Sequence, residues 1–150
     1  ALRALGHGQK VCVIQFMKGS RRYGEVRMAR RLPGFTLEQF GRTCFVDRRF
    51  PDPKDVKLAR AGLERAREVI GARRHDLVIL DEINVAVQYG LVPVEDVVAL
   101  LKAKPLAVEV ILTGRGAAPE IVELADLVSE VREVKHHFRK GFKSRPGVEM

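Results

Sequence analysis

An acidic pair that follows a short apolar run could bind a divalent cation. Asp81 and Glu82 come directly after residues 77–80 (LVIL), which have the length and composition of a buried strand. In the Walker B segment of nucleotide-binding proteins, carboxylates at a strand end hold Mg²⁺ directly or through water, and the cation neutralises phosphate charge. An acidic pair at this point could also cap a following helix. The pair alone leaves both roles open.

Two other polar clusters follow apolar runs and could bind an anion. Residues 15–19 (QFMKG) place Lys18 just after a strand-like run, and residues 113–116 (TGRG) place Arg115 in a glycine-rich turn. An ammonium, a guanidinium and backbone N–H groups are the donors that phosphate oxygens accept from. A solvated arginine in an ordinary connection from strand to helix would show the same pattern.

Other catalytic and phosphate-binding motifs are missing from the sequence. No G-x-x-x-x-G-K-[ST] loop occurs in the 150 residues. Residues 6–10 (GHGQK) resemble one superficially, but they follow a helical segment and precede a strand, so we predict a turn there. No Ser, His and Asp arrangement suggests an acyl-transfer triad. Residues 135–137 (KHH) fit a polar strand end as well as a ligand or an acid/base group.

Apolar runs alternate with helical segments along the chain. A helix is predicted from Pro53, with Asp52 as its cap, to Gly71; a second opens at Pro93, and a short third starts at about Pro119. Strands are predicted at residues 11–16, 35–40, 77–80, 108–112 and 127–134. This order predicts an α/β fold, in which a mainly parallel sheet has helices on both faces.

The carboxyl ends of the predicted strands should bring the polar clusters together. Ligands of open parallel sheets bind beyond these ends, so Lys18, the acidic pair and the TGRG turn are expected at one edge. Residues 41–53 are too polar and too proline-bounded for the interior of an element, and we expect a functional loop. Residues 1–5 have the pattern of the last turns of a helix, which suggests that the chain starts inside an element.

Length and composition indicate one globular domain over residues 1–150. No apolar run approaches the roughly 20 residues that span a bilayer, and no signal-peptide pattern occurs at the start. Cys12 and Cys44 are far apart, with no C-x-x-C. We therefore expect a cytoplasmic protein with free thiols and no membrane partner.

The net charge of +8 is concentrated in two segments. Residues 18–31 and residues 132–145 each carry six basic side chains and one acidic side chain. Clustered positive charge suggests a polyanionic partner, which could be nucleic acid, a triphosphate or a phosphorylated small molecule. We expect small phosphorylated ligands and no nucleic acid.

Several stretches together resemble the P-loop family of corrinoid adenosyltransferases, the ATP:cob(I)alamin or cob(I)yrinic acid a,c-diamide type. They contain the motifs QFMKG, ILDEIN, LTGRG, ELAD and VKH, and they cover nearly the whole chain in the family's order. The matching stretches are residues 1–20, 23–26, 76–97, 110–138 and 140–150. Together these motifs are far more specific than a lone Walker B fragment.

The resemblance implies a RecA-like P-loop NTPase fold, with its first strand and phosphate-binding loop immediately before Ala1. It also implies that Asp81 and Glu82 hold the Mg²⁺ of ATP, and that no catalytic group is needed beyond positioning groups. The implied nucleotide-binding residues are Lys18, Thr113, Gly114 and Arg115. The implied corrinoid-binding residues are Phe16, Met17 and Phe45. The chain has no Trp, so it lacks the intact aromatic pair that some relatives use beside the cobalt.

The implied activity is transfer of the 5′-deoxyadenosyl group of ATP to Co(I) of a corrinoid, with release of triphosphate, in adenosylcobalamin biosynthesis or salvage. A homodimer is implied, as is a separate flavoprotein or flavin reductant, because the chain has no recognisable flavin site. Two alternatives come from the residues themselves. A P-loop ATPase of motor or regulatory type would share the sheet and the acidic pair, and a basic nucleic-acid-binding module would explain the positive segments.

Overall fold

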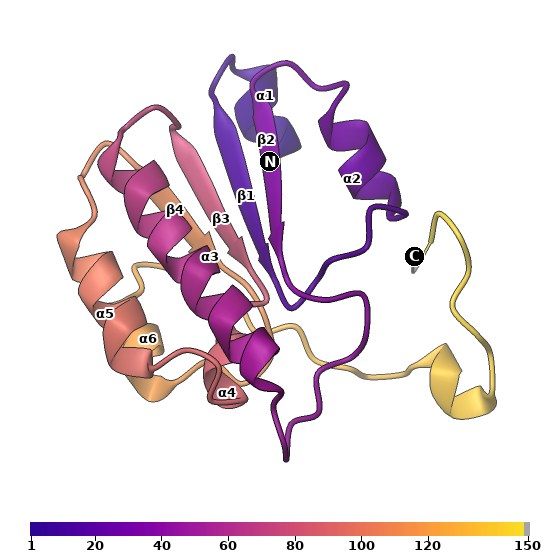
Figure 1. Ribbon diagram of the computed structural model, residues 1–150. Helices are drawn as coiled ribbons and strands as arrows, with labels where there is room; N and C mark the ends of the chain where they lie inside the picture. Colours follow the sequence, from indigo (N-terminus) through magenta and orange to yellow (C-terminus); the bar gives the residue numbers. More distant parts are fainter. Residues whose placement is uncertain (149–150) are drawn as a thin grey trace.

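A four-stranded, all-parallel sheet forms the centre of the computed structural model, which describes residues 1–148 (Figure 1). The strands lie in the order β2-β1-β3-β4, and β1 pairs in parallel with both β2 and β3. Their bounds are β1 Val11–Phe16, β2 Phe35–Phe40, β3 Leu77–Asp81 and β4 Glu109–Leu112. The first three match the predicted strands to within one residue, and β4 starts one residue later than expected.

Helices flank this sheet, and α3, α5 and α6 correspond to the three helices that the sequence predicts. Their bounds are α1 Leu2–Gly6, α2 Gly24–Ala29, α3 Pro53–Gly71, α4 Ile83–Gln88, α5 Val94–Ala103 and α6 Pro119–Leu124, followed by a short 3-10 helix, η1, at His137–Lys140. The alternation of strands and helices confirms the α/β class and is consistent with a RecA-like fold. No helix in residues 1–148 is long and apolar enough to cross a membrane.

The core lies on both faces of the sheet, because successive side chains of a strand point to opposite faces. On one face Cys12, Ile14 and Phe16 of β1 are fully buried in the larger cluster, together with the apolar side of α3. On the other face Val11 and Val13 pack against residues of α1. Figure 1 shows α3 lying along the first face and α1 behind the strands. The central strand β1 is buried at every position, as a strand covered on both faces should be.

Helix α3 shows why its ends could be predicted from sequence. The side chain of Asp52 accepts a hydrogen bond from the backbone N–H of Lys54 (2.8 Å), and Pro53 occupies the first helical position. The first N–H groups of a helix have no acceptor within the helix. Asp52 supplies an acceptor for one of them, and Pro53 has no N–H to pair. The buried side includes Leu63 and Ile70, which repeat at helical spacing.

The structure corrects one predicted strand and adds two helices. Residues 127–134 form no strand, and Leu127, Val131 and Val134 are exposed. Their β-branched composition favours an extended backbone, but a strand exists only where its N–H and C=O groups pair with a neighbour. Helices α2 and α4 were not predicted, because six residues are too few to show a helical period.

Candidate functional site

A chain of hydrogen bonds joins the carboxyl ends of all four strands. Nε2 of Gln39 on β2 donates to Oε1 of Gln15 on β1 (3.1 Å), and Nε2 of Gln15 donates to Oδ2 of Asp81 on β3 (3.1 Å). Oγ1 of Thr113, just after β4, donates to the other carboxylate oxygen of Asp81 (2.9 Å). The predicted convergence of the polar clusters at one edge is therefore confirmed for these residues.

The carboxylate of Asp81 accepts hydrogen bonds from three protein donors. In addition to Gln15 and Thr113, the ammonium of Lys18 binds its Oδ2 at 2.7 Å. Burial of Lys18 works against its charged form, but the hydrogen bond and the negative charge of Asp81 outweigh burial and hold the pKa of Lys18 above its usual value. Asp81 thus neutralises Lys18, and its Oδ2, which accepts from both Gln15 and Lys18, has little capacity left for direct contact with a cation.

Glu82, the next residue, has the opposite environment. Its backbone is left-handed (φ 65°), and its N–H donates to Oγ1 of Thr113 (3.0 Å), which holds this strained conformation. Within residues 1–148 no hydrogen bond or ion pair joins its carboxylate to another residue, although its charge contributes to the raised pKa of Lys18. Glu82 precedes α4 but makes no side-chain cap bond, so the capping alternative fails for this residue in the described chain.

These environments decide which residue could hold Mg²⁺. No group of three or more His, Cys, Asp and Glu side chains in the described residues could hold a metal ion alone. Mg²⁺ in nucleotide sites is usually bound through one or two carboxylates plus substrate phosphates and water, so a closed protein cage is not required. The free carboxylate of Glu82 fits that role, and the engaged carboxylate of Asp81 fits a supporting role.

The TGRG turn packs onto the start of α4. The N–H of Asn84 donates to the carbonyl of Thr113 (3.2 Å), and its side-chain amide donates to the carbonyl of Gly114 (3.4 Å). Gly114 has φ +120°, and a Cβ there would lie 3.1 Å from the backbone nitrogen of Val85, so only glycine suits this position. Arg115 is exposed, and no other described residue binds it. Its guanidinium is thus available to a ligand at this edge.

The predicted corrinoid-binding residues separate into three environments. Phe45 is fully exposed in the connection between β2 and α3, and Met17, which has φ 60°, is half-buried at the end of β1. Phe16 is completely buried in the main core, so it packs the protein interior and offers no surface to a ligand. We therefore drop Phe16 from the candidate site.

Gln39 is a site residue that sequence reasoning missed. It donates through one amide nitrogen to Gln15 and to the carbonyl of Ser20 (3.3 Å), so it joins β2 to the segment after β1. A signal was present, because β1 and β2 both end in Gln-Phe, and Gln15 pairs in register with Gln39. A polar side chain at the same position of two apolar strands indicates a contact between them.

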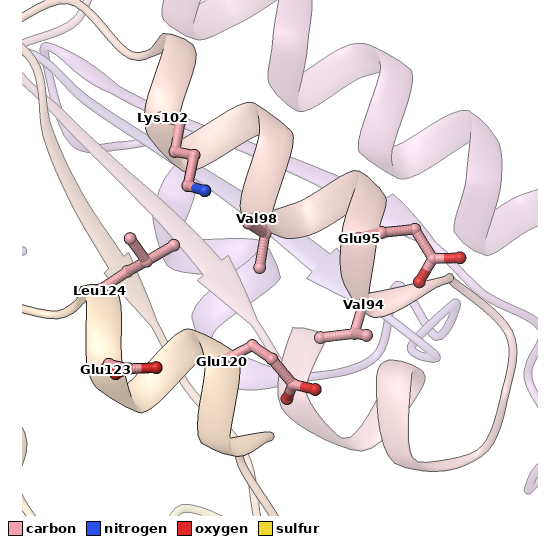
Figure 2. A pocket seen from close by; sticks show the side chains of 7 residues that line it. All are labelled: Val94, Glu95, Val98, Lys102, Glu120, Glu123 and Leu124. Atoms are coloured by element: carbon pink, nitrogen blue, oxygen red, sulfur yellow. The ribbon is translucent and has the colours of Figure 1, made fainter.

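A groove lies between α5 and α6 (Figure 2). It has a volume of about 390 Å³ and is lined by Val94, Glu95, Val98, Lys102, Glu120, Glu123 and Leu124. None of the candidate residues lines it, and its three carboxylates would repel a triphosphate. The strand-end edge is therefore the better candidate for a nucleotide site.

Comparison with known proteins identifies the family of this chain. The family model described as ATP:corrinoid adenosyltransferase BtuR/CobO/CobP matches residues 1–150. A corrinoid adenosyltransferase of Pseudomonas aeruginosa is 38% identical over 157 residues, which cover 98% of this chain and 72% of that protein. Corrinoid adenosyltransferases of Escherichia coli K12 and Salmonella typhimurium are 37% and 36% identical, and each match covers 99% of this chain and 75% of the relative. With the strand-end motifs in place and the match running over the whole length, this chain belongs to the corrinoid adenosyltransferase family.

Proposed function

We propose that the edge beyond β1, β3 and β4 binds the triphosphate end of ATP while its adenosyl group is transferred to the Co(I) of a corrinoid. The observation that carries the proposal is the contrast between two adjacent carboxylates. Asp81 is held by three protein donors, whereas no described residue binds the carboxylate of Glu82. Family membership supplies the substrates, since the matching proteins are corrinoid adenosyltransferases.

The proposed reaction needs alignment more than acid or base chemistry. The electron pair of Co(I) attacks the 5′ carbon of ATP, a cobalt–carbon bond forms, and the bond from that carbon to the triphosphate oxygen breaks. Triphosphate leaves with the bonding electrons, and cobalt is formally oxidised by two electrons. Because Co(I) is itself a strong nucleophile, the protein has to hold the two reactants in line and stabilise charge on the leaving group.

The candidate residues would contribute to binding of Mg²⁺ and triphosphate in different ways. Glu82 would hold Mg²⁺, which when bound supplies positive charge to the phosphate oxygens. Arg115 would bind the same oxygens through its guanidinium, which has no other described partner. A lysine ammonium carries three donor hydrogens, so Lys18 could still donate to a phosphate while it binds Asp81. Thr113 and Gly114 would fix the turn that carries Arg115.

The remaining parts of the proposal rest on the family resemblance. The cobalt must be reduced to Co(I) before transfer, and we propose that a separate flavoprotein or reduced flavin supplies the electrons. A homodimer, a cytoplasmic location and a P-loop contributing backbone donors to the phosphates belong to the same proposal. The natural acceptor is a complete cobalamin or an earlier corrinoid.

The test uses the full-length protein with ATP, Mg²⁺ and chemically reduced cobalamin. We expect a light-sensitive adenosylated corrinoid and triphosphate in equal amounts, with no product when ATP or protein is omitted. Hydrolysis of ATP to ADP without corrinoid, stimulated by DNA or RNA, would instead indicate the ATPase alternative and reject the proposal.

A further inference from the structure

The connection between β2 and α3 begins with an unusually close backbone contact. A Cβ on Gly41 would collide with backbone atoms of Met17 and Lys18, and a Cβ on Gly19 would collide with the carbonyl of Gly41. The start of this connection therefore lies directly against the segment that carries Lys18. Only glycine permits two backbones to approach this closely.

Arg42, the next residue, forms a fork with the first turn of α3. Its Nε and Nη2 bind the two carboxylate oxygens of Asp55 at 2.7 and 2.6 Å, and its Nη1 binds Asp52 at 2.8 Å. The side chain of Asp55 is only 2% exposed, so its charge depends on Arg42 for compensation. A bidentate guanidinium contact fixes direction as well as distance. Arg42 therefore ties the beginning of the connection to the beginning of the helix that ends it.

Between these two ends the chain has a single apolar contact with the core and several exposed side chains. Val46 packs against the main core cluster. Phe45 is fully exposed and Phe50 is 80% exposed, so neither ring has a packing partner that would fix its position. The placement of residues 43–51 thus depends strongly on the fork at their base.

We propose that Arg42 is a positioning residue that holds residues 43–51 at the strand-end edge in the conformation that accepts the corrinoid. This inference rests on the proposed function, because it assigns the loop to the corrinoid and the edge beyond β1, β3 and β4 to the triphosphate. Arg42 acts through the loop and touches neither reacting atom. Loss of the fork should therefore weaken the use of corrinoid much more than the use of ATP.

The chain offers a matched control for this fork. Arg65 of α3 binds Glu38 of β2 in the same bidentate manner, with Nε at 2.9 Å from Oε2 and Nη2 at 2.9 Å from Oε1. This second fork joins the middle of α3 to β2 and makes no contact with residues 43–51. Lysine keeps the charge at either position but cannot form the planar fork. Comparison of Arg42→Lys with Arg65→Lys therefore isolates the effect of the loop.

The first measurement is limited digestion of the full-length protein with trypsin in the absence of substrates, with mass spectrometry to follow cleavage after Arg48 and Arg49, which are exposed in the loop. Arg42→Lys should speed this cleavage about tenfold or more, because release of the base of the loop lets the loop enter a protease more readily. Arg65→Lys should leave the cleavage rate unchanged. An unchanged cleavage rate in Arg42→Lys would overturn the positioning role, and this result does not depend on whether the protein is an adenosyltransferase.

The second measurement is steady-state adenosylation of reduced cobalamin with each substrate varied. In Arg42→Lys we expect the KM for cobalamin to rise about tenfold or more, with the KM for ATP within about twofold of the wild-type value. Arg65→Lys should match wild type in both. Faster cleavage of the loop with an unchanged KM for cobalamin would overturn the assignment of the loop to the corrinoid. No adenosylation by wild type would reject the proposed function, with the cleavage result still valid.

A second variant guards against loss of folding, since Arg42→Lys weakens the partner of a buried carboxylate. The double variant Arg42→Met with Asp55→Leu removes both charges and keeps apolar volume, an exchange that proteins often tolerate. It should unfold at a temperature close to that of wild type and still show faster cleavage of the loop and a raised KM for cobalamin. A well-folded double variant with wild-type cleavage and kinetics would overturn the inference.

Discussion

At the scale of single residues, Asp81 and Glu82 are neighbours in sequence with different environments. Asp81 accepts hydrogen bonds from Lys18, Gln15 and Thr113, so its carboxylate holds the strand ends together. Glu82 has a left-handed backbone, and its carboxylate makes no hydrogen bond or ion pair within the described chain. A strained backbone angle at this place is consistent with a functional position, because such strain persists only where surrounding contacts enforce it.

The first prediction concerns the charge of Glu82. Glu82→Gln keeps the size and hydrogen-bonding capacity of the side chain but removes the charge that a cation needs. We expect turnover to fall by roughly 10² or more, which is about 2.7 kcal/mol in the activation barrier. The temperature of unfolding should hardly change, because the carboxylate makes no hydrogen bond or ion pair within the described chain.

Adenosyl transfer and thermal unfolding are measured on the same sample. The control is Glu109→Gln, which removes an exposed carboxylate at the first residue of β4, at the opposite end of this strand from Thr113. It should retain both activity and stability. A stable and fully active Glu82→Gln variant would remove Glu82 from the site.

The second prediction concerns the hydroxyl of Thr113. This oxygen donates to Asp81 and accepts from the N–H of Glu82, so it joins both carboxylate residues to the end of β4. Thr113→Val has nearly the same shape but leaves one donor and one acceptor unpaired. We expect a loss of about 1–3 kcal/mol in the free energy of unfolding, together with reduced turnover.

Thr113→Ser keeps the hydroxyl and should restore most of both properties. The free energies of unfolding are measured by denaturant unfolding, and turnover is measured as adenosylation of cobalamin. If the Val and Ser variants behave alike, the hydroxyl has no role in organising this edge.

At the scale of elements, the close contact between the ends of β1 and β2 places the loop beside Lys18. Gly41→Ala inserts a methyl group against the backbone of Met17 and Lys18, and neither backbone can move without disturbing β1. We expect a cost of about 1–3 kcal/mol in the free energy of unfolding, as for other overpacked positions, and reduced turnover because Lys18 is displaced.

Gly71→Ala is the control for this substitution. Gly71 ends α3, and nothing lies within 4 Å of the position that its Cβ would take. Alanine should therefore be neutral or stabilise the helix by about 0.5–1 kcal/mol. Equal stability of the Gly41→Ala variant and wild type would show that the two strand ends are not packed as described.

At the scale of the whole molecule, the two cysteines distinguish the core from the surface. Cys12 is fully buried in the main cluster, whereas Cys44 is exposed in the connection between β2 and α3. Burial, with a smaller contribution from the charge of Glu38, raises the pKa of the Cys12 thiol to about 11. Thiolate is the reactive form of cysteine, so the burial of Cys12 and the raised pKa of its thiol both protect it from reagents.

We therefore predict that a thiol reagent at about pH 8 modifies Cys44 rapidly and Cys12 only after unfolding. Peptide mass spectrometry identifies the modified residue with and without denaturant. The raised pKa also means that the unfolded state loses the Cys12 proton first as the pH rises, so this thiol lowers stability between about pH 9 and about pH 11. A Cys12→Ala variant would lack this alkaline contribution, and rapid native modification of Cys12 would contradict the burial.

The sequence by itself determined the features that depend on local pattern. The cap at Asp52 and the apolar repeat of α3 predicted that helix to the residue, because caps and period act within a few residues of one another. The alternation of strands and helices predicted a parallel sheet, and polar residues after three strands predicted a common edge. The motifs QFMKG, ILDEIN, LTGRG, ELAD and VKH also indicated the family, which the comparisons confirm.

Only the tertiary structure decided which polar groups bind each other and which apolar groups are buried. It pairs Lys18 with Asp81, adds Gln39 to the network and places Phe16 in the core, because contacts across a sheet join residues far apart in sequence. It also leaves residues 127–134 outside the sheet, since a strand depends on a neighbour's backbone as well as on its own composition. Local pattern specifies which side of an element is apolar, whereas packing specifies the partner.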